Sequence, residues 1–367
     1  MPYIHQSAQW PAFFWSQEKL APLLAVVRHR QGRLLGRMEA LGFGFQAEAS
    51  LQTLTLDVIK SSEIEGEQLN PEQVRSSIAR RLGMDIAGLI PADRHVEGIV
   101  EMMLDATQNY NTSLTGTRLF GWHAALFPTG YSGMQRIVVG GWRDNTPDDP
   151  MQVVSGPLNR QKVHYEAPAS KRLPHEMMLF LDWYNTNNII DPVLKAAIAH
   201  LWFVTIHPFD DGNGRIARAI GDMQLARAEG STQRFYSLSA QIRNERNAYY
   251  DILEQTQKET LDITAWLEWF LGCLDRALTA TGDTLDAVMK KARFWETHAG
   301  TNFNSRQKMM LNKLLDGFVG KLTSSKWAKM AKCSSDTAIR DINDLVNQGI
   351  LTKEPAGGRS TSYILQL

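Results

Sequence analysis

The stretch His207-Pro208-Phe209-Asp210-Asp211-Gly212-Asn213-Gly214-Arg215-Ile216-Ala217-Arg218 decides how this chain is interpreted. It places a base, carboxylates, two glycines and two arginines in one short segment. Histidine has a reference pKa near neutrality and suits general-base work. Glycine allows unusual backbone angles and a close approach of ligand to backbone. The segment therefore predicts a site that holds phosphates and deprotonates a hydroxyl beside them.

The flanking sequence predicts a helix on each side of this segment. Residues Pro192 to Thr205 carry apolar side chains at helical spacing on one face, and Asp191 can cap the helix. This helix must end before Pro208, because proline disfavours the α-conformation of the preceding residue. A second helix is expected from about Asn213, where apolar residues again recur every three or four positions.

A glycine-rich turn that enters a helix N-terminus is suited to anions, because the first backbone N–H groups have no internal partner. Arg215 and Arg218 lie three residues apart, so both guanidinium groups can point at the same phosphates. Asp211 is placed to hold Mg²⁺, a hard cation that prefers oxygen ligands. The alternatives are an ordinary loop histidine, an Asp-Gly-Asn-Gly turn, or a calcium loop. The EF-hand pattern is absent.

The segment matches H-P-F-x-[D/E]-G-N-G-R-x-x-R and in this resembles the Fic family. The resemblance implies that His207 deprotonates a Tyr, Thr or Ser hydroxyl of a target protein, which then attacks the α-phosphate of ATP. Asp211 would hold Mg²⁺ across the α- and β-phosphates. AMP would stay on the target and pyrophosphate would leave. The residues implied to bind ATP are Gly212, Asn213, Gly214, Arg215 and Arg218.

A second motif, Ser61-Ser62-Glu63-Ile64-Glu65-Gly66, fits the family's inhibitory pattern [S/T]-x-x-x-E-[G/N]. The resemblance implies that Glu65 pairs with Arg218 and blocks productive binding of the γ-phosphate, with Ser61 at the other fixed position. A helix is expected to run from about Leu51 to Glu65. The alternative to an inhibitory motif is an ordinary acidic helix end on the surface. The resemblance also implies a second possible role for this acid, because some family members use it to remove AMP.

Two further sites are implied by the resemblance. A β-hairpin flap would grip the target by strand addition, with Val163, His164 and Tyr165 as its candidates. Short strand-like runs are expected at Arg136–Val139, Gln152–Val154 and Lys162–Tyr165. Asn247 and Tyr250 are the candidates that close an adenine pocket, although the tyrosine suits a helix–helix core equally well.

The composition restricts the class of protein. Lysine plus arginine equals aspartate plus glutamate, 39 of each, which argues against a general nucleic-acid or membrane-surface binder. Cys273 and Cys333 form neither a disulfide framework nor a metal-spaced cluster. No secretory signal and no membrane-spanning run is expected. We therefore expect a cytoplasmic protein without a membrane partner.

The chain is expected to be mainly α, with four parts. Residues 1–90 form an N-terminal helical domain that carries the inhibitory helix, and 91–285 form the Fic catalytic domain. Residues 286–320 are expected to be a helical connector, and 321–367 resemble a winged helix-turn-helix. This last part is predicted to contain helices at Ser324–Ala331 and Ala338–Val346, strands at Ile350–Thr352 and Thr361–Leu365, and a turn at Ala356-Gly357-Gly358.

The would-be recognition helix carries Asp336, Asp341 and Asp344 against a single arginine, Arg340. Acids on a helix that enters a phosphate-lined groove are costly. The sequence therefore favours a protein-docking or dimer-supporting module over DNA binding.

The leading hypothesis is an autoinhibited protein adenylyltransferase that also modifies itself, with ATP and Mg²⁺ and, by the family resemblance, as a homodimer. The alternatives are a Fic enzyme that uses another nucleotide or removes AMP, and a nucleotide-sensing transcription regulator that binds DNA.

Overall fold

A computed structural model describes residues 3–40, 42–84, 89–156, 160–186, 189–258, 260–315, 318, 320–354 and 361–366, without the side chains at 43, 283–289 and 292. The described chain is mainly helical, as predicted, with only small two- and three-stranded sheets. It divides into two compact units, residues 1–281 and 282–367. Within the described residues, no helix is long and apolar enough to span a membrane.

The N-terminal segment is helical and carries the second motif at a helix end. It comprises η1 (Ile4–Gln6), α1 (Gln17–Glu39), α2 (Phe43–Ile64) and α3 (Pro71–Arg81). The C-cap of α2 is Glu65, and Gly66 follows with φ +87°, a conformation that glycine adopts without strain. The Asn70 side chain accepts hydrogen bonds from the first backbone N–H groups of α3. The expected helix therefore ends at the predicted place and places Glu65 on a fixed turn.

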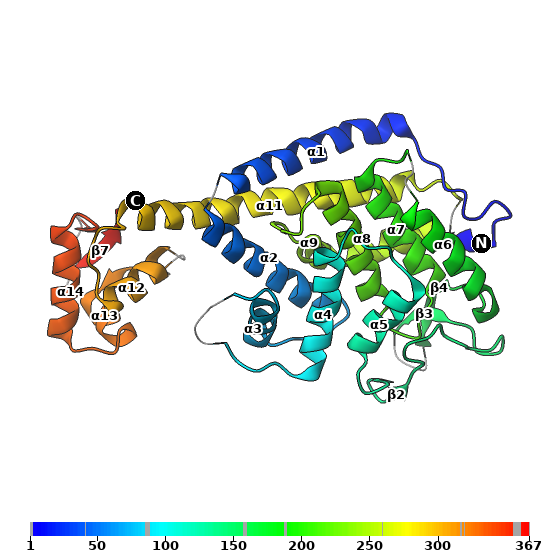
Figure 1. The fold of residues 1–367 in the computed structure, drawn as a ribbon, viewed down its shortest axis with the longest axis horizontal. Helices are drawn as coiled ribbons and strands as arrows, with labels where there is room; N and C mark the ends of the chain where they lie inside the picture. The colour runs from blue at the N-terminus through cyan, green and yellow to red at the C-terminus, as the bar shows by residue number, and fades with distance from the viewer. Residues whose placement is uncertain are drawn as a thin grey trace. The chain divides into compact units, whose positions relative to one another are not determined.

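The remaining helices of the first unit surround a pair at its centre. Their bounds are α4 (Arg94–Gln108), α5 (Gly116–Leu126), η3 (Ser170–Arg172), α6 (Leu173–Asn185), α7 (Pro192–Ile206), α8 (Asn213–Glu229), α9 (Leu238–Asn244), α10 (Arg246–Lys258) and α11 (Thr264–Thr297), the last of which continues into the second unit. Helices α7 and α8 pack along each other, while α2 lies against α9 and α4 against α5 and α8 (Figure 1).

Helix α7 is buried more completely than its sequence suggests. We expected one core face, but every residue from Val193 to Ile206 is buried. His200 Nε2 lies 2.9 Å from the Tyr249 hydroxyl, whereas His200 Nδ1 and Trp202 Nε1 are buried without a hydrogen-bond partner in the described chain. Because α7 is packed on all sides, it is a rigid support for His207 at its C-terminal end.

Two hairpins lie between α5 and α6. The first joins β1 (Tyr131–Ser132) to β2 (Gln135–Arg136), and the second joins β3 (Gln152–Ser155) to β4 (Lys162–Glu166), both antiparallel. The predicted strand at Arg136–Val139 is wrong beyond Arg136. There the backbone N–H of Val138 donates to a carboxylate oxygen of Asp210 at 2.8 Å, so the chain is tied to the motif loop.

The second unit contains α12 (Ser305–Leu315), β5 (Leu322–Thr323), α13 (Ser324–Met330), α14 (Ser335–Asn347), β6 (Leu351–Lys353) and β7 (Ser362–Leu365). Both predicted helices and both predicted strands are present, and the strand order is β5-β7-β6. The predicted turn at 356–358 lies outside the described residues. Residues 286–320, expected to be a connector, supply Phe294, Phe303, Met310 and Leu311 to the buried core of this unit.

Candidate active site

The motif loop is held by its own side chains and by one arginine. His207 ends α7 in the left-handed conformation, with φ 52° and ψ 58°. Arg143 donates from Nε to the His207 carbonyl at 2.7 Å. The Asn213 side chain brackets Phe209, since it accepts from the Phe209 backbone N–H at 3.0 Å and donates to its carbonyl at 2.7 Å. Asn213 thus fixes the loop through both ends of its side-chain amide.

The His207 ring is only partly exposed, and its Nδ1 lies 3.1 Å from the Val204 carbonyl. A proton on Nδ1 would donate to this carbonyl and leave Nε2 as a free acceptor; this tautomer is assigned from the geometry. Burial lowers the pKa of His207 to about 4, although the Val204 carbonyl opposes the shift. The ring is therefore neutral at pH 7, the form that a general base requires.

The carboxylate of Asp211 faces the start of α8. Its Oδ1 accepts from the Gly212 backbone N–H at 2.6 Å, and its Oδ2 accepts from the Ser132 hydroxyl. Gly212 has φ +79°, and a Cβ there would lie 2.9 Å from the Phe127 ring. Among the described residues no group of three or more metal-ligating side chains exists. A single carboxylate suits Mg²⁺, which commonly binds through one or two carboxylates and substrate phosphates.

The N-terminus of α8 offers unpaired backbone donors. The first intrahelical hydrogen bond runs from the Ile216 N–H to the Gly212 carbonyl at 3.0 Å. The preceding N–H groups, of Asn213, Gly214 and Arg215, have no helical acceptor and lie at the positive end of the helix dipole. This end of α8 can therefore bind an anion.

Arg218 is buried and bound to both fixed residues of the second motif. It donates to the Ser61 hydroxyl and the Ser61 carbonyl, each at 2.9 Å, and to Glu65 Oε1 at 2.7 Å. Its own Nη1 is buried and makes no hydrogen bond within the described chain. The pairing expected of Glu65 and Arg218 is thus present, across 153 residues of sequence.

Glu65 also lies directly over the glycine-rich turn. A Cβ added to Gly214 would meet Glu65 Oε1 at 2.3 Å, closer than real side chains approach. The carboxylate therefore occupies space beside the unpaired N–H groups of α8. An anion bound at the helix end and the Glu65 carboxylate compete for the same region.

Arg215 has a partner that the motifs do not identify. Its Nη1 lies 2.8 Å from Glu67 Oε2, and the same oxygen lies 3.3 Å from His95 Nε2. Burial tends to raise the pKa of Glu67, but the hydrogen bond from His95 and the charge of Arg215 outweigh it and lower the pKa. The hydrogen bond to Glu67 in turn raises the pKa of His95. No spacing in the sequence links these three residues, since they lie on different elements.

The three flap candidates differ in accessibility. Val163 is exposed, while His164 is held by Glu254 and by the Ser155 hydroxyl. Tyr165 is only 1% exposed and donates to the Thr205 carbonyl at 2.7 Å. Tyr165 is therefore a core residue that joins the hairpin to the end of α7, and its backbone is paired with Val153 of β3.

The two adenine-pocket candidates, Tyr250 and Asn247, also differ in their surroundings. Tyr250 lies under Arg246, with 5.0 Å from guanidinium carbon to ring centre, and burial and the charge of Glu65 raise its pKa. Tyr250 is thus close to the motif. Asn247 is exposed, and within the described residues no hydrogen bond joins its side chain to the motif.

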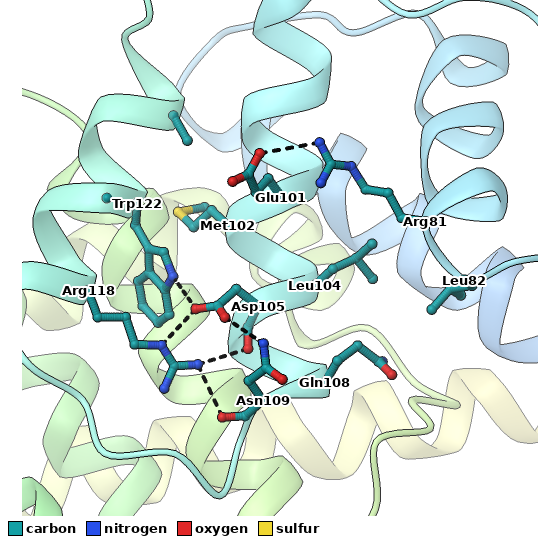
Figure 2. A pocket seen from close by; sticks show the side chains of 12 residues that line it. Arg81, Leu82, Glu101, Met102, Leu104, Asp105, Gln108, Asn109, Arg118 and Trp122 are labelled. Carbon is teal, nitrogen blue, oxygen red and sulfur yellow. Dashed lines mark hydrogen bonds and ion pairs between the residues drawn. The ribbon is translucent and has the colours of Figure 1, made fainter.

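A cavity of about 490 Å³ lies between α3, α4 and α5 (Figure 2). Its polar groups satisfy one another: Asp105 accepts from Arg118 and Trp122, each at 2.7 Å. None of the motif residues lines it. None of the residues that line this cavity has a buried side-chain polar atom without a hydrogen-bond partner, and the motif loop remains the candidate site.

A neutral histidine, a carboxylate and two arginines around a helix N-terminus are groups that phosphoryl and nucleotidyl transfer use. Residues 113–225 match the model of the Fic/DOC family, and residues 3–84 match a domain of unknown function, DUF4172. Residues 113–225 therefore form a Fic/DOC-family domain.

Curated relatives carry the same family name. The chain is 28% identical to Protein adenylyltransferase Fic of Aedes aegypti, over 60% of this chain and 40% of that protein. It is 33% identical to the protein of the same name from Nematostella vectensis, over 31% of this chain and 25% of that one. The chain thus spans less than half of the curated relatives it matches. A Fic family protein from Desulfovibrio desulfuricans G20 shares the fold at 20% identity, with a TM-score of 0.57 over 96% of this chain and 97% of that one.

In the second unit, the three acids of α14 do not share one face. Asp341 is buried, and its carboxylate accepts from Arg306 at 2.7 Å and from Asn304 at 2.9 Å. The exposed acids are Asp336 and Asp344, the latter bound to Gln307 at 2.8 Å. The expected accumulation of three acids on a groove-facing surface is therefore wrong for Asp341.

Proposed function

We propose that the protein transfers AMP from ATP to a hydroxyl of a target protein and of itself, and that Glu65 restrains this reaction. The observation that carries the proposal is the buried Arg218 held by Glu65 at 2.7 Å beside a neutral His207. The family of residues 113–225 and the adenylyltransferase relatives support the same chemistry.

Each residue has a role that its surroundings suit. His207 takes the proton of the attacking Tyr, Thr or Ser hydroxyl at Nε2. The N–H groups at the start of α8, with Arg215 and Arg218, orient the phosphates and balance their charge. Asp211 would hold Mg²⁺, which supplies further charge neutralisation when bound. The catalysis proposed is therefore one of positioning and electrostatics.

The restraint follows from competition for one guanidinium. While Arg218 is bound to Glu65 and Ser61, its Nε and Nη2 are engaged and only Nη1 is left for a γ-phosphate. Glu65 also repels an anion over Gly214. The same carboxylate could align a water molecule for removal of AMP, which is the alternative activity of the site. Use of another nucleotide in place of ATP is the other alternative.

For the second unit we propose a docking role with a protein partner, a second copy of the chain among them. DNA binding by α14 is the competing proposal, and the inward position of Asp341 removes one of the objections to it. A gel shift with genomic fragments tests it, and a salt-dependent shift abolished by Arg340→Ala would favour DNA.

The proposed reaction is tested with ATP labelled at either end. The Glu65→Gly protein is incubated with Mg²⁺ and ATP carrying the label on the α- or on the γ-phosphate. We expect protein-bound label from α-labelled ATP alone, because the bond broken lies between the α- and β-phosphates. Label from the γ-position would instead identify a phosphotransferase, and label from neither would contradict the proposal.

A further inference from the structure

Arg215 lies beside the unpaired donors of α8 and is already engaged. Its side chain is 3% exposed, and its Nη1 lies 2.8 Å from Glu67 Oε2. Its guanidinium carbon lies 5.1 Å above the centre of the Phe127 ring, the ring that Gly212 also approaches. Its Nε is buried and has no hydrogen-bond partner in the described chain. Glu67 is thus the acid that neutralises this buried cation.

Glu67 is held in this position by contacts that do not involve Glu65. Its backbone N–H donates to the Ser62 carbonyl at 3.0 Å. Its carboxylate oxygen Oε2 is shared between Arg215 and His95, the latter on α4. His95 and Arg215 together keep the carboxylate ionised at neutral pH despite its partial burial. The acid is therefore held from both sides, by the Arg215 guanidinium and by the His95 ring.

We propose that Glu67 is a second restraint on the same site, which competes with a nucleotide phosphate for Arg215 while Glu65 competes for Arg218. The inference rests on the proposed function and concerns its regulation. Removal of Glu65 alone leaves Arg215 paired, so the site is then only partly released. Removal of Glu67 leaves a buried, uncompensated guanidinium beside a helix N-terminus, and such a group binds an anion more tightly.

The expected gain in nucleotide affinity depends on the fraction of molecules in which Glu67 is paired with Arg215. A site whose binding-competent state is populated about one time in ten binds its ligand about tenfold more weakly. We therefore expect Glu67→Gln to tighten nucleotide binding by about tenfold in the Glu65→Gly background.

The experiment measures binding and transfer separately. Calorimetry with α,β-methylene ATP and Mg²⁺ gives the dissociation constant for wild type, Glu65→Gly, Glu67→Gln and Glu65→Gly/Glu67→Gln. Transfer of label from α-labelled ATP is followed for the same set. The matched control is Glu63→Gln, because Glu63 lies at the same helix end but pairs with Lys60 at 2.8 Å and Arg243 at 3.5 Å.

Tighter binding on Glu67→Gln, with no change on Glu63→Gln, supports the second restraint. If Glu65→Gly transfers AMP but Glu67→Gln binds as its parent does in both backgrounds, this inference fails and the proposed function stands. If Glu67→Gln tightens binding but no form transfers AMP, the inference stands and the proposed function fails. Absence of nucleotide binding in every form overturns both.

Discussion

At the scale of the residue, the site is set by local charge balance. Two buried arginines of one helix each have an acid partner from the turn after α2, Glu65 for Arg218 and Glu67 for Arg215. His207 stands beside them as a neutral ring because burial disfavours its charged form. Arg215 and Arg218 are therefore cationic groups for which an anion can compete, and His207 is a base that can accept a proton at neutral pH.

The titration of His207 tests this balance. Its pKa is lowered to about 4, so we expect the ring to remain neutral from pH 8 down to about 5. Histidine resonances in NMR spectra, assigned with a His207→Ala variant, report the value directly. A midpoint near 6.5 for this ring would mean that it is solvated and that the account of the base is wrong.

Substitution of Ser61 should raise AMP transfer less than substitution of Glu65 does. The Ser61 hydroxyl accepts from Arg218 Nε at 2.9 Å, while its carbonyl makes a separate bond to the same guanidinium. Ser61→Ala removes only the first contact, so we expect AMP transfer to rise by about two- to fivefold, the equivalent of about 0.5–1 kcal/mol. Glu65→Gly, measured alongside, should give a larger rise. Equal activity of Ser61→Ala and wild type would show that the hydroxyl does not hold Arg218 in place.

At the scale of the element, much of the site can be predicted from the sequence. Pro208 and the capping residues Asp191 and Asn70 determine where helices end and begin, because these effects act within one turn. The complete burial of α7 and the pairing of Glu67 with Arg215 could not be predicted. Both depend on which elements pack together, and no local pattern contains that information.

The position of Tyr165 also depends on packing that no local pattern predicts, and it leads to a prediction about stability. The family resemblance makes Tyr165 a candidate of the target-binding flap, but this side chain enters the core and donates to the Thr205 carbonyl at the end of α7. Tyr165→Phe leaves that carbonyl without its side-chain donor, and we expect a loss of about 1–2 kcal/mol in the free energy of unfolding. Urea unfolding measures it, with the exposed Val163→Thr as control. No loss would mean that water replaces the bond.

At the scale of the whole molecule, buried histidines predict loss of stability in acid. Burial lowers the pKa of His123 to about 4 and that of His200 to about 3. The unfolded chain takes up protons near pH 6.5 that the folded chain does not, so stability is complete above 6.5 and falls as the pH decreases.

Between pH 7.5 and 5.5, His123 and His200 together should lower the free energy of unfolding by about 2–3 kcal/mol. Each of them contributes about 1.4 kcal/mol for every unit of pH below 6.5. The comparison is the urea midpoint of the first transition at the two pH values, in wild type and in His200→Gln. Since His123 stacks on Phe209 of the motif loop, at 4.2 Å between ring centres, acid should also disturb the site. An unchanged midpoint would contradict the burial of neutral rings.

The central claim, that one site contains both a base and a restraint, is tested by a single assay. Wild type, Glu65→Gly and Glu65→Gly/His207→Ala are incubated with α-labelled ATP and Mg²⁺, with and without cell lysate as a source of targets. We predict little label on wild type, strong label on the Glu65→Gly protein, and a loss of at least about 100-fold in the double variant. Equal labelling of wild type and Glu65→Gly, or labelling that survives the loss of His207, would contradict the account.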